Sequence, residues 1–510
     1  MRIKLRLSSH RPRGENLETK KGELIMSLEK SKQNSAMQVR RLEFRGGWGV
    51  SFLPVCVFLF FCVFYFIIFK AFEMYALAMG AFVGLLIGAL LTKKGCYEAF
   101  WTAVYEGAKE AVPVGVLLLI IGMFSALVKA TNISTGFVWL ANALGVSGGL
   151  FSAFTFFAVC VIASATGSSL GTMFTCFPIF YPAGVLLGCD PAVLAGAIVS
   201  GGVFGDNLAP ISDTTIISAS TQEYSKRSGF ADVGGCVSSR LKYALAAGIP
   251  SMLLFGIFGG GGTAGAGAAD YLAGNMNPTS LVMLLPVAVM LFVAVKTRNI
   301  YKAITVGIAL GTAVGLAFGL LTFDSIISVA DGVPMGFLTD GVSSMMATVI
   351  LVFSVYGIMG VLTAAGVLDR IAGGILNSPL GKSARGAELA MMIGISVTTL
   401  IFGGVTSASM ATFGKIQNEI GKRVGLHPYR RANLLDGFAN AIVVAVPFLS
   451  VFVFVGASLT GGYDFVEPLS LTQVAGHMFY SMILFVVLLA SILTGWGRIY
   501  EGADGKPEKR

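Results

Sequence analysis

The chain has 510 residues, of which 55% are hydrophobic and only 12% are charged, and its mean hydropathy is +0.79. A soluble domain carries about 25% charged residues, so this composition excludes a soluble globular protein and predicts an all-α polytopic membrane protein. The net charge of +9 comes largely from one end of the chain, and no nucleic-acid-binding pattern is present. The seven cysteines form no CxxC pair and the three histidines are scattered, so we expect no cofactor.

The first 45 residues (1–45) form a polar arm rich in lysine and arginine. A cleavable signal would place its apolar region far nearer the start, so the positive-inside rule predicts that this arm lies in the cytoplasm. An extra transmembrane helix is expected at residues 46–72. The predicted location is therefore a cell membrane, plasma or inner, crossed many times, with the N-terminus on the cytoplasmic side.

The rest of the chain contains apolar segments that approach the roughly 20 residues a bilayer crossing requires, and we expect about 11–13 spans in all. Two long units, residues 73–220 and 300–460, are separated by a connector at 221–299 with about two transmembrane helices. A last helix and a polar tail occupy residues 461–510. Three apolar segments are expected to be broken helices, namely 148–187, 191–219 and 389–414.

The two long units resemble each other in sequence. Four short patterns recur in the same order with similar spacing. They are GxxxGxxxG (Gly80, Gly84, Gly88 and Gly307, Gly311, Gly315), an acid–glycine pair (Glu106-Gly107 and Asp340-Gly341), TGSSLGT with TSASMAT (166–172 and 406–412), and GCDP with GLHP (188–191 and 425–428). Each match alone is weak, but their shared order predicts an internal repeat of about residues 73–220 against 300–457.

Charge indicates that the two copies are inverted. Lys93 and Lys94 follow the first glycine-rich helix, whereas the loop after the second has three aspartates and no basic residue. These loops should lie on opposite sides, which predicts two inverted repeats with broken helices near the bilayer midplane. The segments 369–388 and 415–431 are both basic although one predicted broken span separates them, so their sidedness stays open.

Residues 196–220, GAIVSGGVFGDNLAPISDTTIISAS, place two acids in an apolar stretch. An ionised carboxylate in a bilayer costs about 2.5–3.5 kcal/mol on insertion scales, which favours a functional role for both acids. Pro210 breaks any helix through the segment, and transporters build cation sites at such breaks. The predicted sodium or proton site consists of Asp206, Asp213, Asn207, Ser212 and Thr214. The alternative is that the two acids only cap half-helix ends.

Both copies also contain a hydroxyl-rich break. Released carbonyl and hydroxyl oxygens are hard ligands suited to Na⁺, although hydroxyl groups that only join helices give the same pattern. The first break adds Thr166, Ser168 and Ser169 to the predicted site, and the second-repeat lining is predicted as Thr406, Ser407, Ser409, Thr412, Asp436 and Asn440. The acids of the first copy are not repeated, because aligning Pro210 with Pro447 places Val443 and Ser450 opposite them.

The segment 196–220 resembles the signature of the NhaC-type sodium/proton antiporters of the ion transporter superfamily, which typically reads GxxFGDxxSPISDTTxxSS. The preceding ATGSSLGT, at 165–172, resembles that family's serine/threonine–glycine segment. The resemblance implies secondary antiport by inverted repeats around a midplane site. In two departures, Ala209 replaces the usual serine and the loop 221–242 lacks the histidine-containing segment of many members. The family also includes sodium-coupled exchangers of lactate, malate and other organic solutes, so the substrate stays open.

We therefore expect a secondary active transporter, a sodium/proton antiporter that couples proton entry to sodium export by alternating access. Burial raises the pKa of a carboxylate and a neighbouring cation lowers it, so Asp213, together with Asp206, is expected to hold either a proton or Na⁺. The alternative is a sodium- or proton-coupled exchanger of a small organic acid or amino acid, in which Lys415 or Arg430 holds the carboxylate.

An enzyme is not expected, because the sequence has no HExxH motif and no nucleotide-binding loop. The expected partners are Na⁺, protons and the lipid bilayer. Glycine-rich helices such as 80–88 pack either within one chain or between two, so a homodimer stays open.

Overall fold

The computed structural model describes residues 42–509 apart from 70–73, 134–135, 137–147, 262–277, 298, 368–369, 371–372, 375–381 and 464. Most of the predicted basic arm, residues 1–41, lies outside the described residues. The described part is built almost entirely from helices, which confirms the all-α prediction. Its strands form two short antiparallel pairs: β1 (Ser328–Ala330) with β2 (Val333–Met335), and β3 (Tyr500–Glu501) with β4 (Pro507–Glu508).

The helices follow the predicted division of the chain. The first are η1 (Trp48–Phe52), α2 (Leu53–Cys62), the π-helix η2 (Val63–Ile68), α3 (Met74–Leu90) and α4 (Tyr97–Ala130). The rest of the first predicted repeat holds α6 (Gly148–Thr166), α7 (Ser169–Leu186), α8 (Pro191–Leu208) and α9 (Asp213–Ser220). The connector holds α10 (Val233–Phe258), η3 (Pro278–Met283) and α12 (Leu284–Thr297).

The second predicted repeat has a matching series of elements. It holds α13 (Ile300–Ala317), α14 (Phe323–Ile326), α15 (Phe337–Ala364), α17 (Ala384–Ile401), α18 (Thr406–Arg423), α19 (Pro428–Ile442), η5 (Pro447–Leu449) and α20 (Val451–Ser458). The last described helices are α21 (Leu471–Gly476) and α22 (Phe479–Thr494).

Length and composition make this a multi-pass membrane protein. Eight of the described helices are long and apolar enough to cross a membrane, and four shorter apolar helices accompany them. Large apolar side chains lie on the outer surface, including Phe60 with 61% and Leu90 with 69% of their area exposed. An apolar outer surface is unfavourable in water and suits contact with lipid.

The predicted broken span 148–187 is two helices rather than one. A turn in which Gly167 has a φ of +69° joins α6 to α7. The helices run antiparallel, since Gly184, late in α7, packs on Phe151, early in α6. Because each helix is long enough to span by itself, the hydroxyl-rich break is the tip of a helical hairpin and not a kink within one span.

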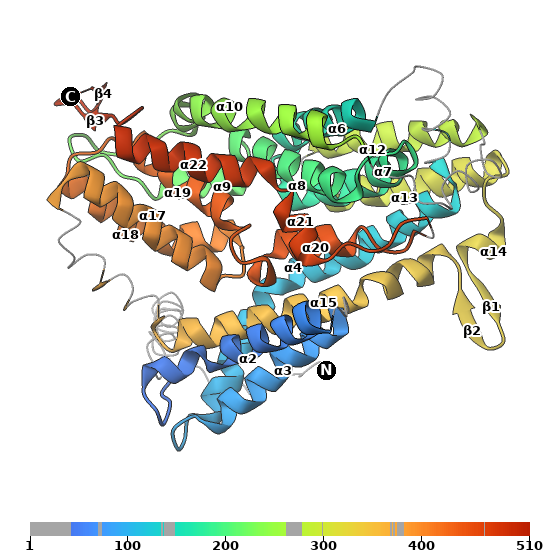
Figure 1. The fold of residues 1–510 in the computed structure, drawn as a ribbon, viewed down its shortest axis with the longest axis horizontal. Coiled ribbons are helices and arrows are strands. Elements are labelled where there is room, and N and C mark those ends of the chain that lie inside the picture. The colour runs from blue at the N-terminus through green and yellow to red at the C-terminus, as the bar shows by residue number, and fades with distance from the viewer. Residues whose placement is uncertain are drawn as a thin grey trace, which may run out of the picture.

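The predicted broken span 389–414 is a second hairpin of the same kind. Gly403 and Gly404, with φ of +61° and +78°, end α17 before α18 begins. These helices also run antiparallel and side by side, with Gly394 against Phe413 (Figure 1). The basic segments before α17 and after α18 therefore lie at the same end of the hairpin. This arrangement removes the conflict in their predicted sidedness.

The long helices α4 and α15 cross at glycines that the repeat pairs with each other. Gly107 of α4 meets Gly360 of α15, and Gly341 of α15 meets Gly122 of α4. A Cβ on Gly122 would lie 2.1 Å from the Gly341 carbonyl oxygen, so only glycine permits this approach. The early part of each helix contacts the late part of the other, so they are antiparallel. Inverted repeats require this direction, and it supports that prediction without testing the repeats as a whole.

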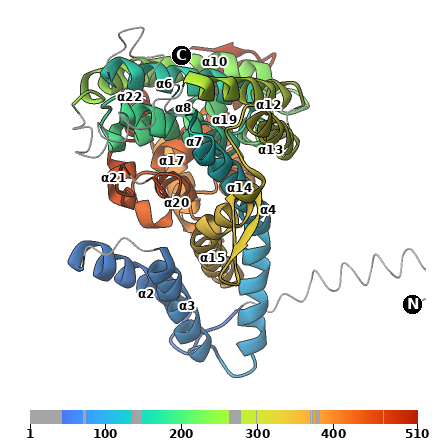
Figure 2. The same ribbon diagram turned by 90° about the vertical axis from the view of Figure 1, so that its right-hand side faces the viewer.

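The glycine-rich helices pack within the chain. Gly84 of α3 lies against the backbone of Pro54 in α2, and Gly307 of α13 lies against Met290 in α12. Figure 2 shows α2 and α3 as a layer beside α15, with α4 running from this layer into the main bundle of α6–α10, α19 and α22. These glycines are therefore occupied inside one chain, and a homodimer stays a prediction.

Candidate functional site

In each repeat the hairpin tip meets the break in a later helix. The α6–α7 tip packs at Gly167 on Ile211, which lies between α8 and α9. The α17–α18 tip packs at Gly404 on Ser450, which precedes α20. The short half-helices then cross over: α9 packs against α18 and α19, whereas α20 packs against α7 and α8. Each repeat thus completes the surroundings of the other repeat's break.

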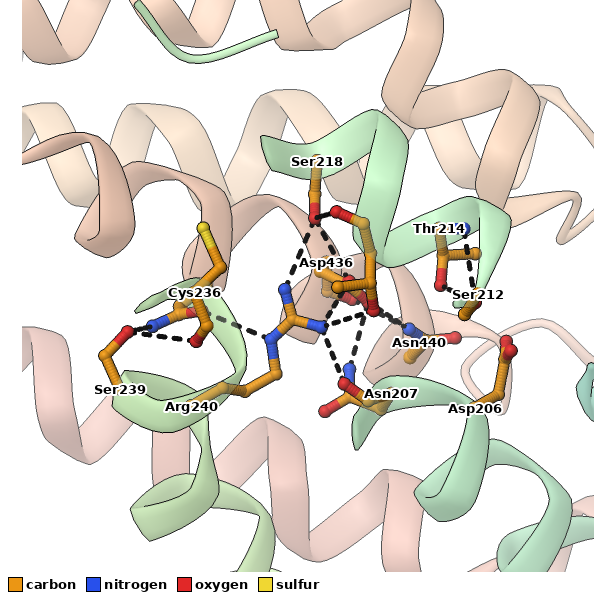
Figure 3. Close-up of polar contacts among 12 residues, drawn as sticks. Asp206, Asn207, Ser212, Thr214, Ser218, Cys236, Ser239, Arg240, Asp436 and Asn440 are labelled. Carbon is orange, nitrogen blue, oxygen red and sulfur yellow. Dashed lines mark hydrogen bonds and ion pairs between the residues drawn. The ribbon is translucent and has the colours of Figure 1, made fainter. Parts of the chain in front are cut away.

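Asp206 lies in the last turn of α8 with only 4% of its area exposed. Ser169, the first residue of α7 at the hairpin tip, donates a hydrogen bond from Oγ to Asp206 Oδ2 at 3.2 Å. The Asp206 carboxylate points toward Ser212, as Figure 3 shows. Ser212 is the N-cap of α9, and its hydroxyl lies 2.8 Å from the hydroxyl of Thr214. The structure therefore gathers a buried acid and three hydroxyl groups at the first repeat's break.

Asp436, in the middle of α19, is fully buried and accepts hydrogen bonds from both repeats. Asn207 donates to its Oδ1 at 3.0 Å and Asn440 donates to the same oxygen at 2.6 Å. Ser218 of α9 donates to Oδ2 at 3.2 Å. Asp436 also forms an ion pair with Arg240 of α10, with Nη1 and Oδ2 2.5 Å apart (Figure 3).

Arg240 is 2% exposed and is held by groups on three helices. Its Nη1 donates to the carbonyl of Asn207 at 2.6 Å, and its Nε donates to Asn433 Oδ1 at 3.2 Å. Nη1 and Nη2 also reach the hydroxyls of Thr215 and Ser218, at 3.2 and 3.3 Å. The connector helix α10 therefore ties the break of the first repeat to the middle of α19.

Two buried amides lie beside the acids, and each has an oxygen without a partner. Asn207 and Asn440 both use their N–H groups on Asp436, while the Oδ1 atom of each accepts no hydrogen bond from the described residues. In Figure 3 the Asn440 oxygen is turned toward Asp206 and Ser212. A buried acceptor without a donor is costly, and such an oxygen is suited to a hard cation.

Other predicted residues lie differently. Asp213 is the first residue of α9 and is exposed. Ser168 caps α7 by accepting from the Gly171 N–H at 3.1 Å, and Thr166 lies 2.9 Å, oxygen to oxygen, from Thr172. These two residues shape the tip next to Ser169.

The second-repeat hydroxyls satisfy one another or nearby carbonyls. Ser409 lies 2.9 Å from Thr399 Oγ1 and donates to the Thr406 carbonyl. Thr412 is exposed and donates to the Ala408 carbonyl, and Ser407 is half-buried. Of the predicted second-repeat lining, only Asp436 and Asn440 contact the first-repeat cluster through hydrogen bonds among the described residues.

The two basic residues considered for an organic carboxylate lie apart from this cluster. Lys415 is exposed on α18. Arg430 is buried in an ion pair with Glu388, with Nε and Oε1 2.8 Å apart, and it also donates to Tyr243 and Ser491. Arg498 binds the second oxygen of Glu388 at 2.7 Å. The Arg430 side chain is therefore engaged within the protein.

The sequence analysis missed Arg240 and Ser218. It started the connector helix at residue 242, after the last charge of the preceding loop, whereas α10 begins at Val233. A helical spacing that continued the apolar run backward would have placed Arg240 inside the helix. Ser218 stands within the predicted motif and lies two turns of helix beyond Ser212.

Residues 41–234 match the Na⁺/H⁺ antiporter family. This part of the chain belongs to that family. The Na⁺/H⁺ antiporter NhaC of Bacillus subtilis is 24% identical over 59% of this chain and 69% of its own length. NhaC of Alkalihalophilus pseudofirmus is 31% identical over 22% of this chain and 24% of its own length. The resemblance to NhaC-type antiporters is thereby confirmed.

A third relative is the malate-2H⁺/Na⁺-lactate antiporter of Bacillus subtilis, 23% identical over 58% of this chain. The chain aligns with 64% of that relative's length. The segment that matches the antiporter family includes Asp206, Asn207 and Ser212, and it ends before Arg240 and Asp436. The second half of the buried cluster therefore lies outside the family match.

Proposed function

We propose that this protein is a sodium/proton antiporter in which Asp206 holds either a sodium ion or a proton. The observation that carries this proposal is the difference between the two buried acids. Asp436 has Arg240 as its counter-charge, whereas no described residue forms an ion pair with Asp206. A buried carboxylate without a cation is strongly disfavoured, so Asp206 is expected to take up a cation in each state of the cycle.

The groups around Asp206 suit both cations. The hydroxyls of Ser169, Ser212 and Thr214 and the free amide oxygen of Asn440 supply hard ligands for Na⁺. A proton on the carboxylate satisfies the same charge requirement without other ligands. Because the two cations compete for one carboxylate, exposing it alternately to the two sides couples proton entry to sodium export.

Asp213 has a separate role in this proposal. It is exposed at the start of α9, on the same break as Asp206. An exposed acid keeps its hydration, so it attracts cations toward the break without binding them in the occluded state. Asp206 therefore takes the carrier role that the sequence gave chiefly to Asp213.

The proposed setting is a cell membrane with a cytoplasmic N-terminal arm. The two hairpins and crossed half-helices supply elements that could move around the site as units. Since Asp206, Asn207 and Asn440 are buried, the described conformation corresponds to a site closed to bulk water.

The test uses purified protein in liposomes that contain a pH-sensitive dye. Na⁺ is added outside without any organic solute, and then with malate, lactate or amino acids. Proton movement driven by Na⁺ alone supports the proposal. Movement that appears only with an organic solute supports the alternative, exchange of a small organic acid or amino acid, which the name of the malate/lactate relative favours.

A further inference from the structure

The Arg240–Asp436 pair is a buried salt bridge in which both partners are fully engaged. Arg240 is 2% exposed and Asp436 is 0% exposed. The carboxylate accepts hydrogen bonds from Asn207, Ser218 and Asn440 in addition to the arginine. Breaking the pair would leave two opposite charges buried without partners, which costs several kilocalories per mole. The pair is therefore expected to persist while the transporter changes conformation.

The chemistry of arginine makes the charge of this pair constant. A guanidinium group keeps its proton in proteins, so Arg240 cannot itself carry a proton through the cycle. Its side chain comes from the connector helix α10 and binds the Asn207 carbonyl of one repeat and Asp436 of the other. The guanidinium therefore occupies the position that a second transported cation would need beside Asp436.

We infer that Arg240 is a resident counter-cation that withdraws Asp436 from ion exchange, so that one sodium ion exchanges for one proton and no net charge crosses the membrane. This inference rests on the proposed function. Asp206 is neutral when it holds a proton and neutral when it holds Na⁺, and the Arg240–Asp436 pair is neutral in both states. One Na⁺ leaves as one H⁺ enters, so charge balances in each half of the cycle.

The first experiment needs no substitution. Wild-type protein in liposomes is given a Na⁺ gradient, and the final pH difference is measured with the membrane potential held at zero and at about 100 mV. Transfer of one net charge would shift the equilibrium ion ratio roughly 50-fold at that potential, whereas one-for-one exchange gives no shift. A potential-dependent pH difference would overturn the inference and leave sodium/proton exchange intact. Absence of Na⁺-driven proton movement would overturn the proposed function itself.

The second experiment tests the charge role of Arg240. Asp436→Asn leaves Arg240 as an unpaired buried cation near the site, so the apparent Na⁺ affinity should fall roughly a hundredfold or more. The double variant Arg240→Gln/Asp436→Asn removes both charges and should recover most of that loss. If the double variant, folded as judged by gel filtration in detergent, is as defective as Asp436→Asn, then neutralisation by Arg240 is not the role of the pair.

A matched control is available in the second buried ion pair. Arg430→Gln removes a buried arginine from its pair with Glu388, away from Asp206. This variant should lower thermal stability while its exchange stays independent of membrane potential. Arg240→Gln should instead make exchange depend on potential, because Asp436 becomes a second carboxylate that requires a cation. Potential-independent exchange in folded Arg240→Gln would contradict the inference.

Discussion

The two broken helices share an architecture and differ in chemistry. In the first repeat, a hairpin tip at Gly167 meets the α8–α9 break, which carries Asp206 and Asp213. In the second, a tip at Gly404 meets the α19–α20 break, where Val443 and Ser450 take the aligned positions. The second repeat places its acid, Asp436, within an unbroken helix and pairs it with arginine. The break is therefore common scaffold, and the free carboxylate belongs to one half.

The largest expected effect separates the two acids of the first break. Asp206→Asn should abolish proton movement driven by Na⁺, because the buried site loses the only charge that exchanges cations. Asp213→Asn should retain exchange with a reduced rate at low Na⁺, since the exposed acid only raises the local cation concentration. Both variants are measured in liposomes with an internal pH dye.

This pair of variants also decides between the acids. If Asp213→Asn abolishes exchange and Asp206→Asn transports like wild type, then Asp213 is the carrier and the burial of Asp206 has only a structural meaning. Equal activity of both variants with wild type would leave the helix-capping interpretation of the two acids.

A smaller effect is expected from two serines that the repeat aligns. Ser169 donates to Asp206, whereas Ser409 lies against Thr399. Loss of a hydrogen bond to a charged group costs about 1.5–3 kcal/mol, so Ser169→Ala should weaken apparent Na⁺ affinity roughly tenfold or more. Ser409→Ala should leave that affinity unchanged. The measurement is the Na⁺ dependence of proton efflux, and equal effects of the two variants would contradict a site confined to the first break.

The sequence identified the motif and the repeat but not the salt bridge at the centre. Apolar runs mark the parts of helices that face lipid, and so their predicted ends fall at the first charge. Arg240 and Glu388 lie inside α10 and α17 as buried charges with partners far away in the sequence. Such pairing depends on tertiary contacts, and no local pattern around either residue reveals its partner.

The hairpins show a second limit of sequence reasoning. A glycine and hydroxyl cluster within a long apolar run is compatible with a kinked span or with two helices joined by a tight turn. The positive φ of Gly167 and of Gly403 with Gly404 allows the chain to reverse, and the choice depends on what α6 and α17 pack against. The charge conflict around residues 369–431 was the one sequence observation that could have revealed the second hairpin.

The two tips should differ in their tolerance of a methyl group. Both Gly167 and Gly404 have a positive φ, which costs about 1 kcal/mol for alanine. A Cβ on Gly167 would also lie 2.7 Å from Ile211 Cγ1, whereas on Gly404 the nearest atom is Ser450 Cα at 3.2 Å. Gly167→Ala should therefore lower the melting temperature in detergent more than Gly404→Ala does. The reverse order would mean that the first tip yields more easily than its contacts indicate.

The smallest effect compares the aligned caps of α8 and α19. Asp190 caps α8 with its carboxylate, which accepts from the Ala192 and Val193 N–H groups. His427 caps α19 through Nδ1, which accepts from the Tyr429 N–H at 3.2 Å, while Nε2 donates to the Gly505 carbonyl. His427 lies outside the candidate spans, and burial lowers its pKa below the ordinary value. The cap on α19 therefore requires a neutral imidazole.

Proton linkage gives the sign of the pH effect. Because the folded pKa of His427 lies below the unfolded value of about 6.5, the unfolded chain binds more protons between the two values. This contribution to stability is complete above the unfolded pKa and is lost as the pH falls toward the folded pKa. His427→Asn keeps a capping acceptor without a titrating group, so its melting temperature should fall less than that of wild type between pH 7.5 and pH 5.5. An identical fall in both proteins would show that other groups, and not this cap, determine the acid sensitivity of the second repeat.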